Sequence, residues 1–167
     1  DRELLRQAQL DAIGILDTED EEAYDELTRL AAQFCNTPVA LISLIDGERQ
    51  WFKSRAGTVL RETPREHAFC AHAIQTPQSL MLVNDAAQDA RFADNPLVTG
   101  GPNIRFYAGA PLVTASGHAL GTLCVLDQVP RTLQRGQIEM LQCLANQIIE
   151  RMEKRMAARK ADPGRAG

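Results

Sequence analysis

Residues 84–127 read NDAAQDARFADNPLVTGGPN-IRFYAGAPLVT-ASGH-ALGTLCVLD, and this stretch decides the fold. A polar segment, 84–103, leads into two strand-like segments, 104–114 and 119–127, which are joined by Ala-Ser-Gly-His. Strands this close in sequence predict an antiparallel hairpin. Ordered loops this long are uncommon inside compact domains and usually serve a function. The stretch therefore predicts a binding loop that leads directly into a sheet.

Two helices are expected at the start of the chain. The first covers 2–13, and the second runs to about Cys35 after a capping box formed by Thr18 and Glu21. The apolar positions of the second helix follow 3,4,3 spacing, at Tyr24, Leu27, Ala31 and Phe34.

A hairpin and a short helix follow. Residues 38–46, PVALISLID, form a continuous apolar run typical of a strand covered on both faces. Asp46-Gly47 predicts a tight turn into a return strand over 49–56. Thr63-Pro64-Arg65-Glu66 has the pattern of a second capping box, which opens a helix to about Ile74.

The remaining elements complete an α+β order. Residues 79–83 predict a third strand, and Pro111 places its own strand at an edge or at a bulge. Residues 133–160 predict a long final helix. Because the strands lie close together in sequence, the order favours an antiparallel α+β sandwich over a parallel doubly wound sheet.

The bulk properties exclude several protein classes. The chain has 167 residues, which suits one domain with a core, and its net charge of -4 gives no indication of nucleic-acid binding. No apolar run is long enough to span a membrane, and no segment has the pattern of a signal-peptide h-region, so a cytoplasmic location is expected. The four cysteines show no metal-ligand spacing and suit a reducing compartment. The first and last residues suggest a segment of a larger protein.

Six motifs in order resemble one known family. They are GILDT, VALISLIDGERQWFKS, ETPREHAFCAHAI, DARFADNPLVTG, IRFYAGAPL and LGTLCVLD. Together they resemble bacterial GAF domains, of the group found upstream of histidine kinases and diguanylate cyclases, over about residues 10–150. The resemblance implies a PAS-related α+β fold: a five- or six-stranded antiparallel sheet with helices on both sides, flanking helices that pair between subunits, and a ligand pocket over one sheet face.

The resemblance does not identify a ligand. Cyclic-nucleotide-binding members carry an NKxDE-type signature, and in this chain no Asn is followed by Lys. Members that attach a bilin usually present Cys next to His, whereas this chain has Cys70-Ala71-His72. No metal signature is present either, so the cofactor stays unknown.

The predicted organisation has four parts: an N-terminal helix (1–16), a sensory core (17–132), a C-terminal signalling helix (133–160) and a linker or tail (161–167). No catalytic residue is expected. Two residues apart on a helix, Cys70 and His72 diverge by roughly 200°, so nucleophilic catalysis by this pair is disfavoured. Cys124 lies among apolar residues and is interpreted as a small hydrophobe.

The candidate site combines the loop with the strands. We expect Asp85 and Arg91 to order the loop, and small residues around Ala108 to leave space for a ligand, although period-two alternation leaves the choice of sheet face open. The candidate ligand-binding residues are Trp51, Phe52, His72, Asp94, Asn95, Arg105, Phe106 and Ala108.

The terminal helices predict a homodimer, in which residues 2–13 can add a second helix to a bundle with the last helix. Apolar residues at 3,4,3,4 spacing form a coiled-coil-like stripe, although part of this stripe must also cover the sheet. The stripe consists of Ile138, Leu141, Ala145, Ile148 and Met152.

The resulting main hypothesis is a non-catalytic regulatory module that senses a small molecule and signals through its last helix to a missing C-terminal effector. Two alternatives are a thiol-dependent reductase of free methionine sulfoxide and a dimerisation scaffold without a ligand.

Overall fold

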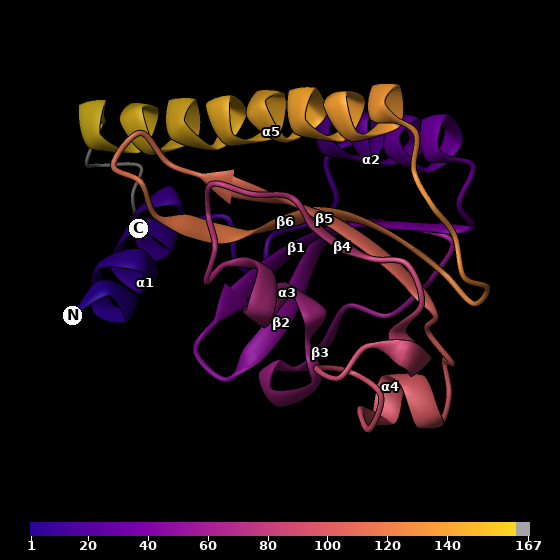
Figure 1. The fold of residues 1–167 in the computed structure, drawn as a ribbon. Coiled ribbons are helices and arrows are strands. Elements are labelled where there is room, and N and C mark those ends of the chain that lie inside the picture. Colours follow the sequence, from indigo (N-terminus) through magenta and orange to yellow (C-terminus); the bar gives the residue numbers. More distant parts are fainter. Residues whose placement is uncertain (163–167) are drawn as a thin grey trace.

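The computed structural model describes residues 1–162, in which seven helices and helical turns surround one sheet of six strands (Figure 1). The helices and helical turns are α1 (Arg2–Ile13), α2 (Glu22–Cys35), η1 (Arg65–His67), α3 (Phe69–Ala73), η2 (Ala86–Gln88), α4 (Pro96–Thr99) and α5 (Arg135–Ala161). The strands are β1 (Val39–Asp46), β2 (Arg49–Ala56), β3 (Glu62–Pro64), β4 (Met81–Val83), β5 (Phe106–Val113) and β6 (Ala119–Asp127).

The six strands form one antiparallel sheet in the order β3-β2-β1-β6-β5-β4. This confirms the α+β class, with six rather than five strands. Pro111 lies beyond Gly109, the last β5 residue paired with β4, so the proline interrupts no ladder on that side. A register irregularity follows at Leu112 and Val113, which agrees with the predicted bulge or edge.

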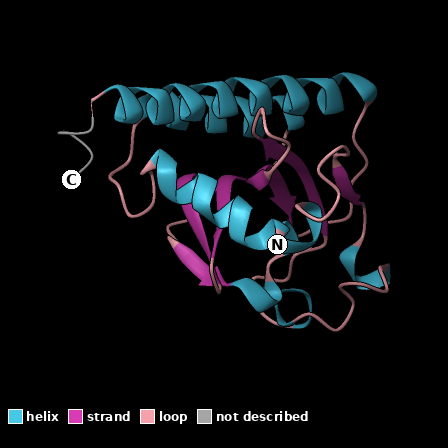
Figure 2. Ribbon diagram, turned by 90° about the vertical axis from the view of Figure 1, so that its left-hand side faces the viewer, coloured by secondary structure: helices cyan, strands magenta, loops and turns pink. Residues whose placement is uncertain are grey.

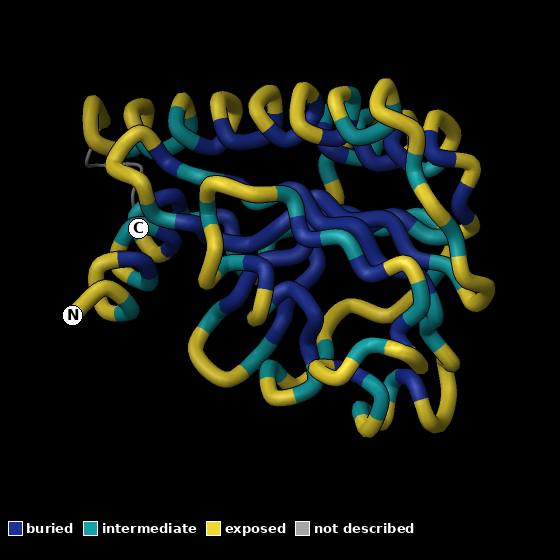
Figure 3. Tube along the Cα trace, viewed as in Figure 1, coloured by how far each residue is buried: buried dark blue, intermediate teal, exposed yellow. Residues whose placement is uncertain are grey.

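The two sheet faces are covered differently. Helices α2 and α5 lie along one face, and α1 crosses below α5 at one end of the strands (Figures 1 and 2). The other face carries the short α3, η2 and α4 and the loops around them. The central strands and the side of α5 that faces them consist mostly of buried residues, whereas many residues in the turns on the opposite side are exposed (Figure 3).

Alternation along β5 and β6 sends neighbouring side chains into two separate clusters. Phe106 and Ala108 pack with the helices, in a cluster that also holds Trp51. Tyr107 and Cys124 belong to the cluster on the loop-covered face.

Both predicted capping boxes are wrong, because tertiary contacts engage their threonines. The N-cap of α2 is Glu21, without a side-chain cap bond, while Thr18 Oγ1 accepts a 2.8 Å hydrogen bond from Lys53 of β2. Thr63 lies in β3, where its Oγ1 accepts a 2.8 Å hydrogen bond from Gln50. The helix expected from residue 64 is therefore split into η1 and α3.

The apolar stripe of α2 is shifted from its predicted positions. Tyr24 and Ala31 are buried as expected, but Phe34 is 48% exposed. Thr28 and Cys35 occupy the inner positions instead. The helix therefore turns a slightly different face to the sheet from the one that hydrophobicity alone selects.

The α5 stripe packs on the sheet of its own chain. Leu141, Ala145, Ile148 and Met152 are each at most 3% exposed and belong to the helix-side core. Ile138 is half-buried. For Leu141, Ala145, Ile148 and Met152 the predicted dimer interface is corrected, because side chains that fill the protomer core cannot also face a second helix. For Ile138 it stays a prediction.

The four-part organisation of the chain stays a prediction. Helix α1 contributes Leu10 and Ile13 to the same core as α5. Of the predicted tail, 161–167, residues 163–167 lie outside the described part of the chain.

Candidate ligand pocket

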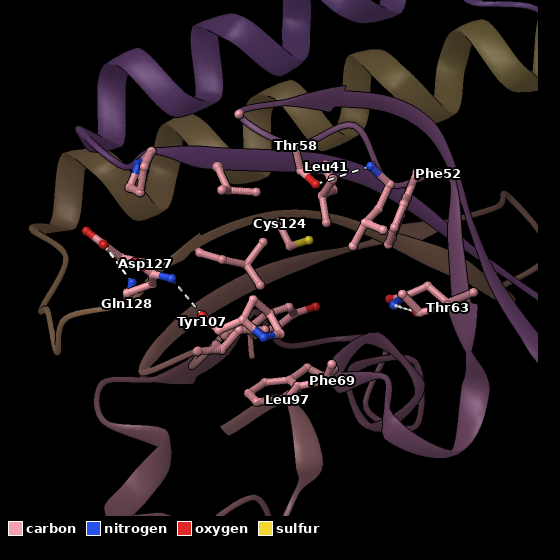
Figure 4. Close-up of a pocket in the computed structure, with 18 residues that line it drawn as sticks. Leu41, Phe52, Thr58, Thr63, Phe69, Leu97, Tyr107, Cys124, Asp127 and Gln128 are labelled. Carbon is pink, nitrogen blue, oxygen red and sulfur yellow. Dashed lines mark hydrogen bonds between the residues drawn. The ribbon is translucent and has the colours of Figure 1, made fainter. Parts of the chain in front are cut away.

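A cavity of about 340 Å³ lies on the loop-covered face of the sheet (Figure 4). Leu41, Phe52 and Cys124 reach it from the central strands, and Phe69 and Leu97 close it from α3 and α4. Its mouth is bordered by the turns after β2 and before β5. The rest of its lining is Pro38, Val39, Gln50, Gly57, Thr58, Leu60, Thr63, Pro102, Ile104, Tyr107, Leu126, Asp127 and Gln128.

An aromatic cluster shapes the side of this cavity where α3 meets β5. The Phe69 ring stacks on Phe92 with centroids 4.1 Å apart, and Tyr107 lies tilted against Phe69 at 5.2 Å. A Cβ at Gly109 would lie 2.4 Å from the Tyr107 hydroxyl, so glycine is required for the ring to lie over β5. The Tyr107 hydroxyl is 3.1 Å from Thr122 Oγ1 and is therefore already hydrogen-bonded.

The polar groups in the wall bind one another. Gln50 accepts from Ser43 at 2.6 Å and donates to Thr63 at 2.8 Å. The Asp127 carboxylate pairs with Arg131, and Gln128 donates to the Pro102 carbonyl at 2.8 Å. These side chains shape the cavity but offer few unmatched groups to a ligand.

The thiols do not form an activated pair. Cys70 and Cys124 are buried, and burial raises the pKa of both thiols, so they stay protonated near neutral pH. Cys70 donates to the Ser43 carbonyl at 3.8 Å. His72 is exposed and lies edge-on to Phe92 at 4.9 Å, so it points away from Cys70.

Only one of the predicted strand residues lines the cavity. Phe52 reaches it, whereas Trp51, Phe106 and Ala108 belong to the helix-side core. The alternates on the opposite face, Tyr107 above all, take the predicted role. Placing Trp51, Phe106 and Ala108 in the pocket is therefore corrected.

The predicted rim residues shape the loop instead. Asn95 caps α4 by accepting from Leu97 N at 2.9 Å, and it donates to the His67 carbonyl. Arg105 donates to the Val98 and Ile104 carbonyls. Asp94 is exposed. Neither these three nor His72 line the cavity, and its rim on this side comes from Leu97, Pro102 and Ile104.

Asp85 and Arg91 make contacts of the kind expected for ordering the loop. Asp85 caps η2 by accepting from Ala87 N at 3.1 Å. Arg91 forms a two-bond pair with Asp89, at 2.8 and 3.0 Å, and its guanidinium lies 5.1 Å from the Phe92 ring centroid. The hydrogen bond from Arg91 lowers the pKa of Asp89.

Sequence reasoning missed Phe69 and Leu97 as pocket residues. Their segments are short and lack a periodic pattern, so only the path of the chain over the sheet brings them to the cavity. The one available signal was the aromatic pair Phe69 and Phe92, one before and one after β4 in the sequence.

An ionic chain joins the strand that walls the cavity to α5. Lys53, next to Phe52 in β2, has a fully buried side chain and binds Thr18 Oγ1, the Glu19 carbonyl and Glu21 Oε2 at 2.6–2.8 Å. Glu21 also pairs with Arg155 of α5 at 3.1 Å. Partial burial acts to raise the pKa of Glu21, but the bonds and charges of Lys53 and Arg155 together lower it.

Comparisons with known proteins agree with this architecture. The chain matches the GAF domain family over residues 19–151. It is 45% identical over 148 residues to a cyclic di-GMP phosphodiesterase from Pseudomonas aeruginosa, a match that covers 88% of this chain and 25% of the relative. The chain thus spans about a quarter of that relative's length.

Solved structures share the fold at low identity. The GAF domain of a phosphoenolpyruvate-protein phosphotransferase from Acinetobacter is 18% identical, with a TM-score of 0.66 over 93% of this chain and 96% of that one. A free methionine-R-sulfoxide reductase from Neisseria meningitidis is 14% identical, with a TM-score of 0.65 over 94% and 93%. Within residues 1–162, no helix has the length and apolar character needed to cross a bilayer.

Proposed function

The chain belongs to the GAF domain family, and on that basis we propose that it is the regulatory sensory module of a bacterial signal-transduction protein. In this proposal a small molecule binds between the sheet and α3–α4. The change then passes through β2 to α5, and from α5 to an effector outside this chain. A ligand acts in this way when it binds one of two conformations of the module more tightly.

One observation carries the proposal: Lys53 adjoins a residue of the cavity wall and is tied through Glu21 to Arg155. A ligand that moves β2 displaces the buried Lys53 ammonium group from its partners, which costs free energy. Because Glu21 binds both Lys53 and Arg155, the displacement also changes the Glu21–Arg155 contact. Arg155 also donates to the carbonyl of Gly14, the C-cap of α1, at 3.1 Å, so the same side chain links α1 to α5.

The effector is proposed to act in cyclic di-GMP signalling or as a histidine kinase. The name of the Pseudomonas aeruginosa relative supports the first kind of effector. Because the matched region is a quarter of that relative, its phosphodiesterase activity is not assigned to this domain.

A thiol-dependent reductase is the alternative from the enzyme class. Three of the four cysteines are buried, and only Cys143 is exposed. Burial raises the pKa of the Cys35 thiol to about 11, so this group too lacks the thiolate that such chemistry needs. We expect no consumption of reductant when free methionine sulfoxide is added.

A homodimer through the helical side remains part of the proposal, with a different surface. Leu30 and Phe34 of α2 are 44% and 48% exposed, and they replace the buried α5 stripe as the candidate contact. Phe34→Glu should lower the dimer fraction in sedimentation velocity. A monomeric wild-type protein at high micromolar concentration would remove dimerisation from the proposal.

Native mass spectrometry combined with hydrogen exchange tests the sensory role. We expect a small molecule to co-purify, and its removal to change amide exchange in β2 and in α5 near Arg155. The Glu21→Gln variant should keep the change in β2 and lose it in α5. A ligand that changes exchange around the cavity alone would contradict signalling through this path.

A further inference from the structure

We propose that the ligand is a neutral, largely apolar molecule of one or two rings, and that the cavity rejects anions. This inference rests on the proposed function, since it names the chemical class that the same cavity would take. It separates this pocket from sites that hold a nucleotide phosphate or the carboxylates of a tetrapyrrole.

Within residues 1–162, the cavity lining carries no cationic side chain. Among the 18 lining residues there is no Lys, Arg or His, and the single charged side chain is Asp127. Arg131 already neutralises this carboxylate, and Gln128 N donates to it at 2.6 Å. An anion entering the cavity would lose part of its hydration and meet no cation in the lining, which is costly in an apolar site.

Hydrogen bonding is the second argument. The buried polar atoms that face the cavity have partners within the protein: Gln50 with Ser43 and Thr63, and Tyr107 with Thr122. Cys124 contributes a protonated thiol, which is a weak donor. A ligand with many polar groups would leave them unpaired, whereas an apolar ligand loses little.

Shape is the third argument. Phe52, Phe69 and Tyr107 give the cavity aromatic walls, and Leu41, Leu97 and Leu126 supply aliphatic ones (Figure 4). Its volume of about 340 Å³ lies at the low end of the ~300–1,000 Å³ range of ligand pockets, which suits one or two rings. At the mouth, Leu60 is 51% exposed, and its neighbour Val59 is 91% exposed. A bound apolar ligand would remove part of the Leu60 side chain from water.

Two fluorescent probes that differ by one sulfonate test the ligand class. The neutral probe is 1-naphthylamine, and the anionic one is 5-amino-1-naphthalenesulfonate; both have two fused rings. For the folded wild-type protein we expect one site for the neutral probe and at least tenfold weaker binding of the sulfonate. Cys124→Phe, which fills the cavity from β6, should abolish binding of the neutral probe, with circular dichroism as the check on folding.

An exposed variant keeps the test independent of core packing. Leu60→Lys adds a cation at the mouth, and it should shift the preference toward the sulfonate probe at least threefold. Val59→Lys, one residue away and outside the lining, is the matched control and should shift it less.

Three outcomes would overturn the proposal. If both probes bind equally and Cys124→Phe blocks both, the sensory pocket stands and the ligand class is wrong. If neither probe binds the folded protein, the pocket is closed and the proposed small-molecule sensing fails with it. If binding of the neutral probe survives in a folded Cys124→Phe protein, the probe occupies another surface and the assignment to this cavity is wrong.

Discussion

The two faces of the central sheet share their strands but differ in what covers them. On one face, α2 and α5 cover the strands (Figure 1), and Trp51, Phe106 and Ala108 pack with them in one buried cluster. On the other face, α3 and α4 are short and meet Phe52, Tyr107 and Cys124 across a cavity. The difference teaches that strand alternation supplies two equivalent apolar surfaces, and that the covering elements decide which surface is core and which is site.

The largest expected effect lies where the two faces are joined. Glu21→Gln leaves the buried Lys53 ammonium without its counter-charge, which should cost about 3 kcal/mol of unfolding free energy. The matched control is Glu22→Gln, which removes an exposed pair with Arg29 and should cost under about 1 kcal/mol. Urea denaturation measures both variants. Equal costs would mean that the Lys53–Glu21 pair contributes no more to stability than an exposed ion pair.

The next effect separates the faces directly. Ala108→Leu enlarges a residue packed against the helices, and Cys124→Leu enlarges one facing the cavity, on the neighbouring strand. Overfilling should destabilise the first variant by about 1–3 kcal/mol, while the second should stay within about 1 kcal/mol of wild type. The same urea titration compares them. A reversed order would assign the free volume to the helix side.

Much of the fold was predictable because its signals are local. Alternation, the Asp46-Gly47 turn and the 3,4 spacing of the helices need no knowledge of distant contacts. The two capping boxes failed because Lys53 and Gln50, far from them along the chain, bind Thr18 and Thr63 in the folded protein. A threonine in the correct local pattern can be captured by a tertiary partner.

The site was predictable only up to the choice of face. Trp51 and Phe52 are adjacent and equally apolar, as are Phe106 and Tyr107, so the sequence supplies both sets without ranking them. The α5 stripe posed the same problem, because the spacing that covers a sheet also forms a coiled coil. In each case the deciding fact is what lies opposite, which is set by the path of the whole chain.

A smaller effect is expected in the loop that covers the cavity. Asp85→Ala removes the side-chain cap of η2, a loss of about 0.5–1 kcal/mol. Amide exchange should become faster over residues 86–104 and stay unchanged in α5. Asp94→Ala changes an exposed carboxylate of the same loop and serves as the control. Equal exchange in both variants would remove Asp85 from this role.

The smallest effect concerns the contact between Glu3 of α1 and Arg65 of η1. Hydrogen bonds from Arg6 and Arg65 lower the pKa of Glu3 from 4.5 to about 2. The carboxylate therefore stabilises the fold fully above about pH 4.5, and this contribution is lost as the pH falls toward 2. Because Glu3 is half-exposed, solvent screening keeps the effect below about 1 kcal/mol. Glu3→Gln should flatten the stability profile over this pH range, and an unchanged acid limb would contradict this role.

Xenon binding in crystals of the protein tests the contrast between the two faces most directly. Xenon occupies dry apolar cavities and is excluded from close-packed cores. We expect a xenon site among Leu41, Phe52 and Cys124, and no xenon between the sheet and α2 or α5 within residues 1–162. Xenon on the helix side, with none beside Phe52, would contradict it.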